Sequence, residues 1–239
     1  MPTLPTTAEE TSPPLSPEER RNRWFEVLLV LLVALTGPLT RALFVLNTGF
    51  RPNLPRSSSS WMLGLLNEVI GILLLGYVLS RSGRRFKDLG LRWSLRDFGF
   101  GLLVYLGSLA TYVTGTLCIQ LVHYVRYSAF YTIPSGRDFF GHPGFAMVPF
   151  VLFNPFFEEL IVRAYLMTEI RELTGSSILA AIASVILQSA YHLYYGWLGA
   201  LSVAFLFIFF AMYYALTRRA FPIIIAHGIF DIVALVRMW

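Results

Sequence analysis

Residues 197–216 read WLGALSVAFLFIFFAMYYAL, an apolar run without a charged side chain. A helix needs about 20 apolar residues to cross a bilayer, so this run is long enough to span one. The whole chain of 239 residues has the same character, with 56% hydrophobic and 14% charged residues and a mean hydropathy of +0.61. Soluble domains carry roughly 25% charged residues. The composition therefore predicts that much of the chain faces lipid.

Seven apolar segments follow one another along the chain. They are 24–46, 61–79, 98–125, a fourth from about 145, 178–195, 197–216 and 221–239. Backbone amides need partners in lipid, so we expect helices rather than barrel strands. The predicted fold is all-α, a transmembrane bundle of about seven helices, with a range of six to eight. The fourth segment can continue past the bilayer as an amphipathic helix through Glu172.

The start of the chain differs in composition from the rest. Residues 1–22 are mostly polar and include many Pro, Thr, Ser and Glu residues, so we expect a disordered N-terminal tail. The apolar run from Trp24 lacks a small-residue cleavage pattern and is predicted to stay as the first membrane helix. A polar, turn-rich linker at 47–60 and a loop with Pro134, Gly136 and Pro143 separate later segments. No repeat is evident, so residues 23–239 are predicted to form a single transmembrane domain.

Basic residues cluster in three of the polar segments. The clusters are Arg20, Arg21 and Arg23; Arg81, Arg84, Arg85, Lys87, Arg92 and Arg96; and Arg218 and Arg219. With seven helices, all three fall on one side of the membrane, and basic residues favour the cytoplasmic side. We therefore expect an integral protein of the cytoplasmic (inner) membrane, with its N-terminus in the cytoplasm. Fewer basic residues fall on the opposite side: Arg51, Arg56, Arg126 and Arg137.

Charge and cysteine content exclude other classes of protein. The net charge of +5 is distributed between membrane segments, without a basic face that alternates with aromatic residues, so no nucleic-acid partner is expected. The single cysteine, Cys118, excludes an internal disulfide and a zinc site of paired cysteines. It lies in an apolar stretch without a nearby base, which favours packing over cysteine-dependent catalysis.

The fourth segment contains the sequence EELIVR, from Glu158 to Arg163. A charge inside a membrane helix costs on the order of 3 kcal/mol and persists where it pairs or lines a cavity. Residues four apart share a helix face, so Glu159 can pair with Arg163 while Glu158 points elsewhere. This asymmetry predicts a structural pair and leaves Glu158 for chemistry. Asn154-Pro155 is expected to break or kink the helix and make room near Glu158.

Two further segments contain histidines. His192 lies in the fifth segment, and His227 precedes Asp231 by four residues in the seventh. That spacing places imidazole and carboxylate on one face, so Asp231 is expected to orient His227. Taken alone, each group also fits a structural role, in which its polar atoms are hydrogen-bonded within the protein. Together, a glutamate, two histidines and a carboxylate can activate water and stabilise an oxyanion.

These motifs resemble the CAAX protease and bacteriocin-processing (CPBP, or ABI) family of intramembrane proteases. That family has E-E-x-x-x-R, F-x-x-x-H and H-x-x-x-N or H-x-x-x-D on separate helices. Here the first reads EELIVR and the third HGIFD, whereas the second matches only at His192. Gln188 stands where the family usually has phenylalanine, a residue we expect to serve packing. The stretch 86–103 resembles a segment often found upstream, so the resemblance covers about 86–239.

The resemblance implies a function and a role for each motif residue. It implies an endopeptidase that hydrolyses a peptide bond of a membrane-associated or prenylated protein or peptide, in a cavity between the C-terminal helices. The catalytic residues would be Glu158 and His192, which activate water, and His227 and Asp231, which stabilise the oxyanion or hold the site. Glu159 and Arg163 would support them. An ionised Asp231 can only accept hydrogen bonds, so it would orient His227 or bind a metal.

The need for a metal stays open at this point. Glu158, His192, His227 and Asp231 form a plausible ligand set for zinc, although H-E-x-x-H is absent. The family is often labelled a metalloprotease, yet its chemistry resembles a glutamate-dependent mechanism, and we expect no required cofactor.

Two alternatives to a protease remain. Buried Glu and His residues also serve proton-coupled carriers, although the chain lacks repeated halves. A catalytically silent relative could act as a membrane scaffold or a bacteriocin-immunity protein. The sequence does not choose the substrate.

Overall fold

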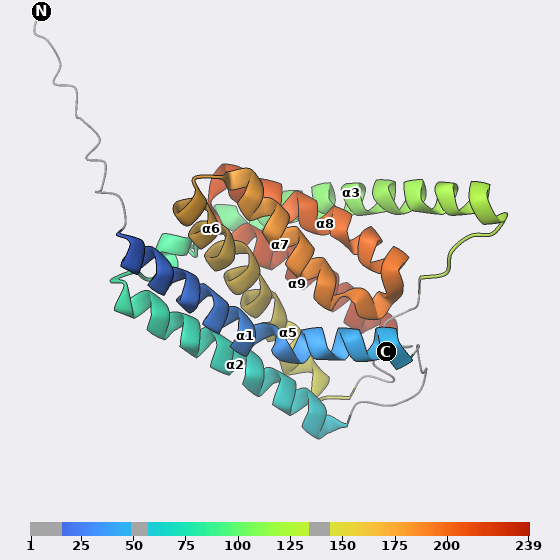
Figure 1. Ribbon diagram of the computed structural model, residues 1–239. Coiled ribbons are helices and arrows are strands. Elements are labelled where there is room, and N and C mark those ends of the chain that lie inside the picture. The colour runs from blue at the N-terminus through green and yellow to red at the C-terminus, as the bar shows by residue number, and fades with distance from the viewer. Residues whose placement is uncertain (1–15, 49–56, 134–143) are drawn as a thin grey trace, which may run out of the picture.

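The computed structural model describes residues 16–48, 57–133 and 144–239, and those ranges are helical and contain no strand (Figure 1). The elements are α1 (Pro17–Thr48), α2 (Ser58–Arg81), η1 (Phe86–Leu89), α3 (Leu95–Tyr127), α5 (Met147–Glu158), η2 (Glu159–Tyr165), α6 (Leu166–Thr174), α7 (Ser177–Tyr191), η3 (Leu193–Tyr195), α8 (Gly196–Thr217) and α9 (Phe221–Met238). The predicted all-α fold is confirmed. The predicted fourth segment, with its extension, is a continuous helix made of α5, η2 and α6.

Some segment boundaries differ from those expected. Helix α1 begins at Pro17, so residues 17–22, which we expected in the disordered tail, are helical. The remaining tail, residues 1–15, lies outside the described residues, as do most of the predicted linker at 47–60 and the loop at 134–143. The fifth segment ends early, because α7 stops at Tyr191 and a short 3₁₀ turn follows. His192 therefore lies at the end of a helix rather than inside one.

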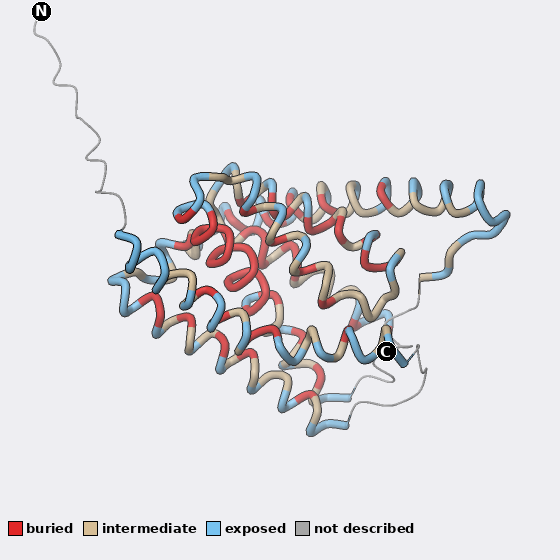
Figure 2. Tube along the Cα trace, in the orientation of Figure 1, coloured by how far each residue is buried: buried red, intermediate tan, exposed pale blue. Residues whose placement is uncertain are grey.

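The helix formed by α5, η2 and α6 is the centre of the bundle. Every residue from Phe157 to Ile170 is buried, and Figure 2 shows this helix as a red coil surrounded by the others. Its middle turns, Glu159–Tyr165, are π-helical, a geometry that is rare and frequent at functional sites. The helix passes Pro155 without a break, so the predicted break is absent and the irregular turns begin four residues later.

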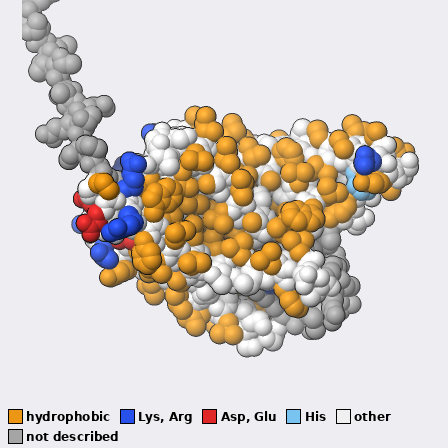
Figure 3. Space-filling model, viewed as in Figure 1, with side chains coloured by type: hydrophobic (Ala, Val, Ile, Leu, Met, Phe, Trp, Pro, Cys, Tyr) orange, Lys and Arg blue, Asp and Glu red, His pale blue; other side chains and the backbone are white. Residues whose placement is uncertain are grey.

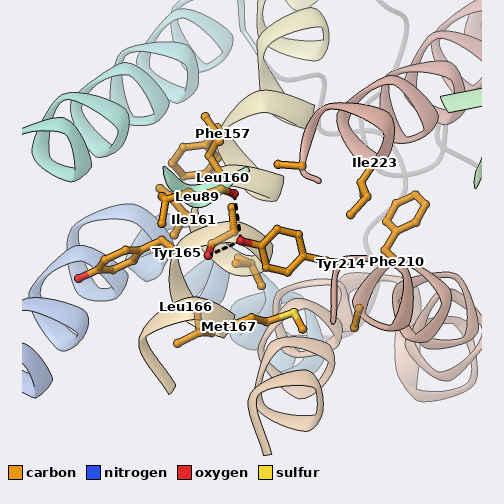
Figure 4. Close-up of a cluster of buried hydrophobic side chains, with 14 of the residues drawn as sticks. Leu89, Phe157, Leu160, Ile161, Tyr165, Leu166, Met167, Phe210, Tyr214 and Ile223 are labelled. Carbon is orange, nitrogen blue, oxygen red and sulfur yellow. Dashed lines mark hydrogen bonds between the residues drawn. The ribbon is translucent and has the colours of Figure 1, made fainter. Parts of the chain in front are cut away.

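Neighbouring helices hydrogen-bond to carbonyls of this π-helical stretch. Ser184 donates to the carbonyl of Val162 at 2.7 Å. The Tyr214 hydroxyl lies 3.1 Å from the carbonyl of Ala164 and 3.0 Å from that of Leu89 (Figure 4). These contacts connect α7, α8 and η1 to the central helix.

Helix α1 changes direction about halfway along (Figure 1). Pro38 lies inside it and lacks an N–H, so it cannot bond to the carbonyl of Ala34 one turn earlier. Asn67 of α2 donates to that carbonyl at 3.2 Å. The kink is thus supported by a side chain from the neighbouring helix.

Ion pairs join several elements at one end of the bundle, which we call the basic end. Arg23 of α1 binds Glu169 of α6 at 2.6 Å, and Arg84, just after α2, also pairs with Glu169. After α8, Arg219 pairs with Asp97 of α3 at 2.5 Å. Arg218 donates to Thr168, the neighbour of Glu169, at 2.7 Å, so residues of all three predicted basic clusters lie together. Figure 3 shows blue and red side chains gathered at this end.

The surface away from the basic end is largely apolar. Figure 3 shows hydrophobic side chains over most of the visible face. Within the described part of the chain, five helices are long and apolar enough to cross a membrane: Pro17–Thr48, Ser58–Arg81, Leu95–Tyr127, Leu193–Thr217 and Phe221–Met238. An exposed apolar band of this extent is costly in water, and lipid accommodates it. The chain is an integral membrane protein.

We predict that Glu169→Ala lowers the free energy of unfolding by about 3 kcal/mol, because two arginines lose a shared buried partner. The side chain of Glu169 is 2% exposed. Glu172→Ala is the matched control: its side chain also pairs with Arg23 and Arg84 but is 45% exposed, so the loss should stay below about 1 kcal/mol. Denaturation in detergent measures both variants, and equal losses would contradict the prediction.

Candidate active site

The four predicted catalytic residues line one cavity of about 520 Å³. They are Glu158, His192, His227 and Asp231. The cavity extends beyond the C-terminal helices in which we expected it, because α1 and α2 also line it, with Leu35, Pro38, Arg41, Trp61 and Glu68 among their residues. Much of the remaining wall comes from apolar side chains of α5 and α9, including Met147, Phe150, Val151, Ala234 and Met238.

Glu158 is buried at the wall of this cavity and accepts hydrogen bonds on both oxygens. Its Oε2 accepts from the Tyr191 hydroxyl at 2.8 Å and from the Gln188 amide at 2.9 Å. Its Oε1 accepts from the Asn154 amide at 3.2 Å. These donors come from α7 and from the preceding turn of α5. They hold the carboxylate in one orientation, as catalysis by a positioned side chain requires.

Glu159 points away from the cavity and pairs with Arg163, as predicted. The Glu159 Oε2 lies 3.3 Å from the Arg163 Nε, and both side chains are fully buried. Arg163 also donates to Ser184 and Gln188 of α7, and its guanidinium lies 5.7 Å from the centre of the Phe207 ring. The adjacent glutamates thus differ in environment: one lines the cavity and the other binds a buried cation.

Gln188 links the two glutamates, which the sequence analysis did not foresee. Its amide nitrogen donates to Glu158 at 2.9 Å and to Glu159 at 3.3 Å, while its amide oxygen accepts from Arg163. Ser184, Gln188 and His192 are spaced four apart, so they share one face of α7. That spacing of polar residues within an apolar helix was the signal available in the sequence. The expectation that position 188 serves packing is therefore incomplete.

His192 caps the end of α7 beside the cavity. Its Nδ1 lies 2.8 Å from the carbonyl of Gln188. A carbonyl only accepts, so Nδ1 carries the proton, and the Nε2 of the neutral ring keeps its lone pair. Aromatic rings surround the imidazole, with Phe207 and Tyr191 centred 4.9 Å away. The ring is thereby held in one tautomer and one position.

His227 is held mainly by Glu159 rather than by Asp231. Its Nδ1 lies 2.9 Å from Glu159 Oε1, within hydrogen-bonding distance. The predicted partner is farther away: Nε2 lies 3.7 Å from Asp231 Oδ1, beyond a hydrogen bond. One turn of α9 does bring His227 and Asp231 to the same face. However, the His227 ring points its Nδ1 toward Glu159 of the central helix. Glu159 therefore has two roles, as the partner of Arg163 and as the residue that orients His227.

A second carboxylate, Glu68 of α2, reaches the same part of the cavity. The Asn154 amide nitrogen lies 2.9 Å from Glu68 Oε1 and 3.2 Å from Glu158 Oε1, so it bridges the two acids. Glu68 is buried, and the sequence analysis gave it no role. The sequence feature that marks Glu68 is the same as for Glu158: an acidic residue within an apolar run.

Residues 141–233 match the family model described as "Type II CAAX prenyl endopeptidase Rce1-like". This stretch is similar to an Rce1-like domain. The matched range includes all six motif residues, from Glu158 to Asp231, and confirms the resemblance to CAAX-protease-type intramembrane endopeptidases at the level of the family. It starts later than the expected boundary near residue 86. Comparisons with curated proteins and with solved structures gave no match.

The four predicted zinc ligands line the same cavity but are not drawn together into one cluster. Within the described ranges, no three His, Cys, Asp or Glu side chains come together in a group able to hold a metal ion. Donors of Tyr191, Gln188 and Asn154 already occupy both oxygens of Glu158. Nδ1 of His227 is bound to Glu159.

We predict that Gln188→Leu lowers the free energy of unfolding by about 2 kcal/mol or more, because buried charged groups lose hydrogen bonds. Gln120→Leu is a suitable control, since Gln120 bonds only to the backbone of Tyr131 in a half-buried position and should cost about 1 kcal/mol. Reversible denaturation in detergent compares the two. A Gln188 variant as stable as the original chain would contradict the bridging role.

Proposed function

We propose that this protein is an intramembrane endopeptidase that hydrolyses a peptide bond of a membrane-associated protein or peptide. The observation that supports it most is the convergence of Glu158, His192 and His227 on one cavity within an apolar bundle. The similarity of residues 141–233 to a family model of peptidases supports this reaction class.

In the proposed reaction, Glu158 and His192 bind and activate a water molecule. The water oxygen attacks the carbonyl carbon of the scissile bond while Glu158 takes up the water proton. Tyr191 and Gln188 keep the Glu158 carboxylate in place as the charge moves. The lone pair on Nε2 of His192 accepts a hydrogen bond from the same water.

The tetrahedral intermediate then collapses with loss of the amine. His227, oriented by Glu159, donates a hydrogen bond from Nε2 to the oxyanion when that nitrogen is protonated. Asp231 adjoins the same nitrogen and supports its protonated form by proximity. Glu158 returns its proton to the leaving nitrogen as the C–N bond breaks, so the products are a carboxylic acid and an amine.

The proposed mechanism does not require a metal ion. Its support is that, among the described residues, no three His, Cys, Asp or Glu side chains group together as metal ligands. The proposed location is the cytoplasmic membrane with the basic end in the cytoplasm, because basic residues favour that side.

We expect Glu158→Gln to lower the rate of peptide cleavage by about 10² to 10⁴, the range for loss of a general base. The folded protein should remain, because the amide has the same size as the carboxyl group. Glu172→Gln, at the exposed basic end, serves as the control and should keep full activity. Proteomic comparison of membranes with each variant identifies the cleaved peptides. Full cleavage by the Glu158 variant would refute the proposed mechanism.

Removal of metal gives an independent test. The purified protein should contain no stoichiometric divalent metal by elemental analysis, and its cleavage rate should be unchanged after dialysis against a chelator. Loss of activity that zinc restores would show that the substrate-bound cavity rearranges to take a metal, and the metal-free mechanism would then be wrong.

A further inference from the structure

The cavity occupies only one half of the bundle. Its lining residues on α1 begin at Leu35, well past Arg23, and those on α2 lie between Ser60 and Glu68, far from Arg84. On the central helix they lie between Met147 and Glu158, and on α9 between His227 and Met238. In each of these four elements, the lining residues are in the half away from the basic end.

The distance between the two ends matches the thickness of a membrane. Ser60, at the outer part of the cavity, precedes Arg81 by 21 residues on the same helix, which corresponds to about 32 Å at 1.5 Å per residue. The hydrocarbon core of a bilayer is about 30 Å thick. Ser60 and the basic end are therefore far enough apart to lie at opposite faces of a membrane.

Packed side chains close the other route to the site. Glu158 and Glu169 are separated by three turns of the central helix, π-helical at first and then α-helical. All residues of this stretch are buried, and none from 159 to 170 lines the cavity. Figure 4 shows Ile161, Tyr165 and Met167 of this stretch in one buried cluster with Tyr214 of α8. Water and a peptide chain reach Glu158 through the half of the bundle that contains the cavity.

We propose that the cavity receives its substrate from the extracytoplasmic side of the membrane, as an extended peptide segment with apolar side chains. The inference rests on the proposed endopeptidase function and adds the side of access. Basic residues favour the cytoplasm, so the basic end faces the cytoplasm and the cavity faces outward. The apolar side chains of Trp61, Phe150 and Met238 provide the contact surface for such a segment. Exported or surface-anchored peptides reach the cavity from this side, whereas a lipid-modified cytoplasmic protein would approach the closed end of the bundle.

Cysteine labelling tests the side of access without any substrate. The background is Cys118→Ser, because Cys118 is exposed. Ser60→Cys places a thiol at the cavity, Ser59→Cys places an exposed one beside it, and Ser80→Cys places an exposed one at the other end of α2. A membrane-impermeant maleimide should label the Ser59 and Ser60 variants on intact cells. It should label the Ser80 variant only in inside-out vesicles. The reverse pattern would overturn the proposal.

Cleavage by oriented vesicles provides the second measurement. The probe is a mixture of water-soluble, quenched fluorescent peptides with apolar residues around the scissile bond. Right-side-out vesicles should cleave it at least tenfold faster than inside-out vesicles, and Glu158→Gln should abolish the signal in both. Faster cleavage by inside-out vesicles would overturn the side of access and leave the endopeptidase intact. Absence of cleavage in detergent solution as well would refute the endopeptidase function, while the labelling result would still decide which face the cavity adjoins.

Discussion

A charged arginine buried among helices requires partners on every side, and Arg163 imposes this requirement on the centre of the bundle. Glu159 supplies the opposite charge, and Ser184 and Gln188 accept hydrogen bonds from the guanidinium. The residues that satisfy Arg163 also touch the cavity groups: Gln188 donates to Glu158, and Glu159 binds His227. The cost of one buried charge is thus offset by a network that also positions the reactive side chains.

Much of this arrangement was predictable because its causes are local in the sequence. Apolar runs of membrane length predict helices, and acids or histidines inside them predict a shared cavity. The pair of Glu159 and Arg163 followed from a spacing of four residues, and it persists although the helix there is π-helical. The grouping of the basic clusters at one end followed from the number of helices.

Other features depend on tertiary contacts that spacing alone does not specify. Asp231 has the right spacing to orient His227, yet the ring can rotate, and Glu159 on another helix is the nearer partner. Position 188 was interpreted by comparison with the phenylalanine of the family motif. The polar contacts of Gln188 depend instead on which residues of the central helix face α7. Glu68 is distant in sequence from the motifs and joins them only because α2 packs beside α5. The chain enters α8 through Gly196, whose φ of 76° suits glycine.

The packed core below Glu158 closes the cavity toward the basic end, with consequences for turnover. In the proposed reaction, the substrate, the hydrolytic water and both product fragments share the same opening. A cleaved fragment that stays bound to the apolar side chains of the cavity obstructs the arrival of the next water molecule and the next peptide. The order and speed of fragment departure would then govern steady-state turnover, and apolar product peptides would act as competitive inhibitors.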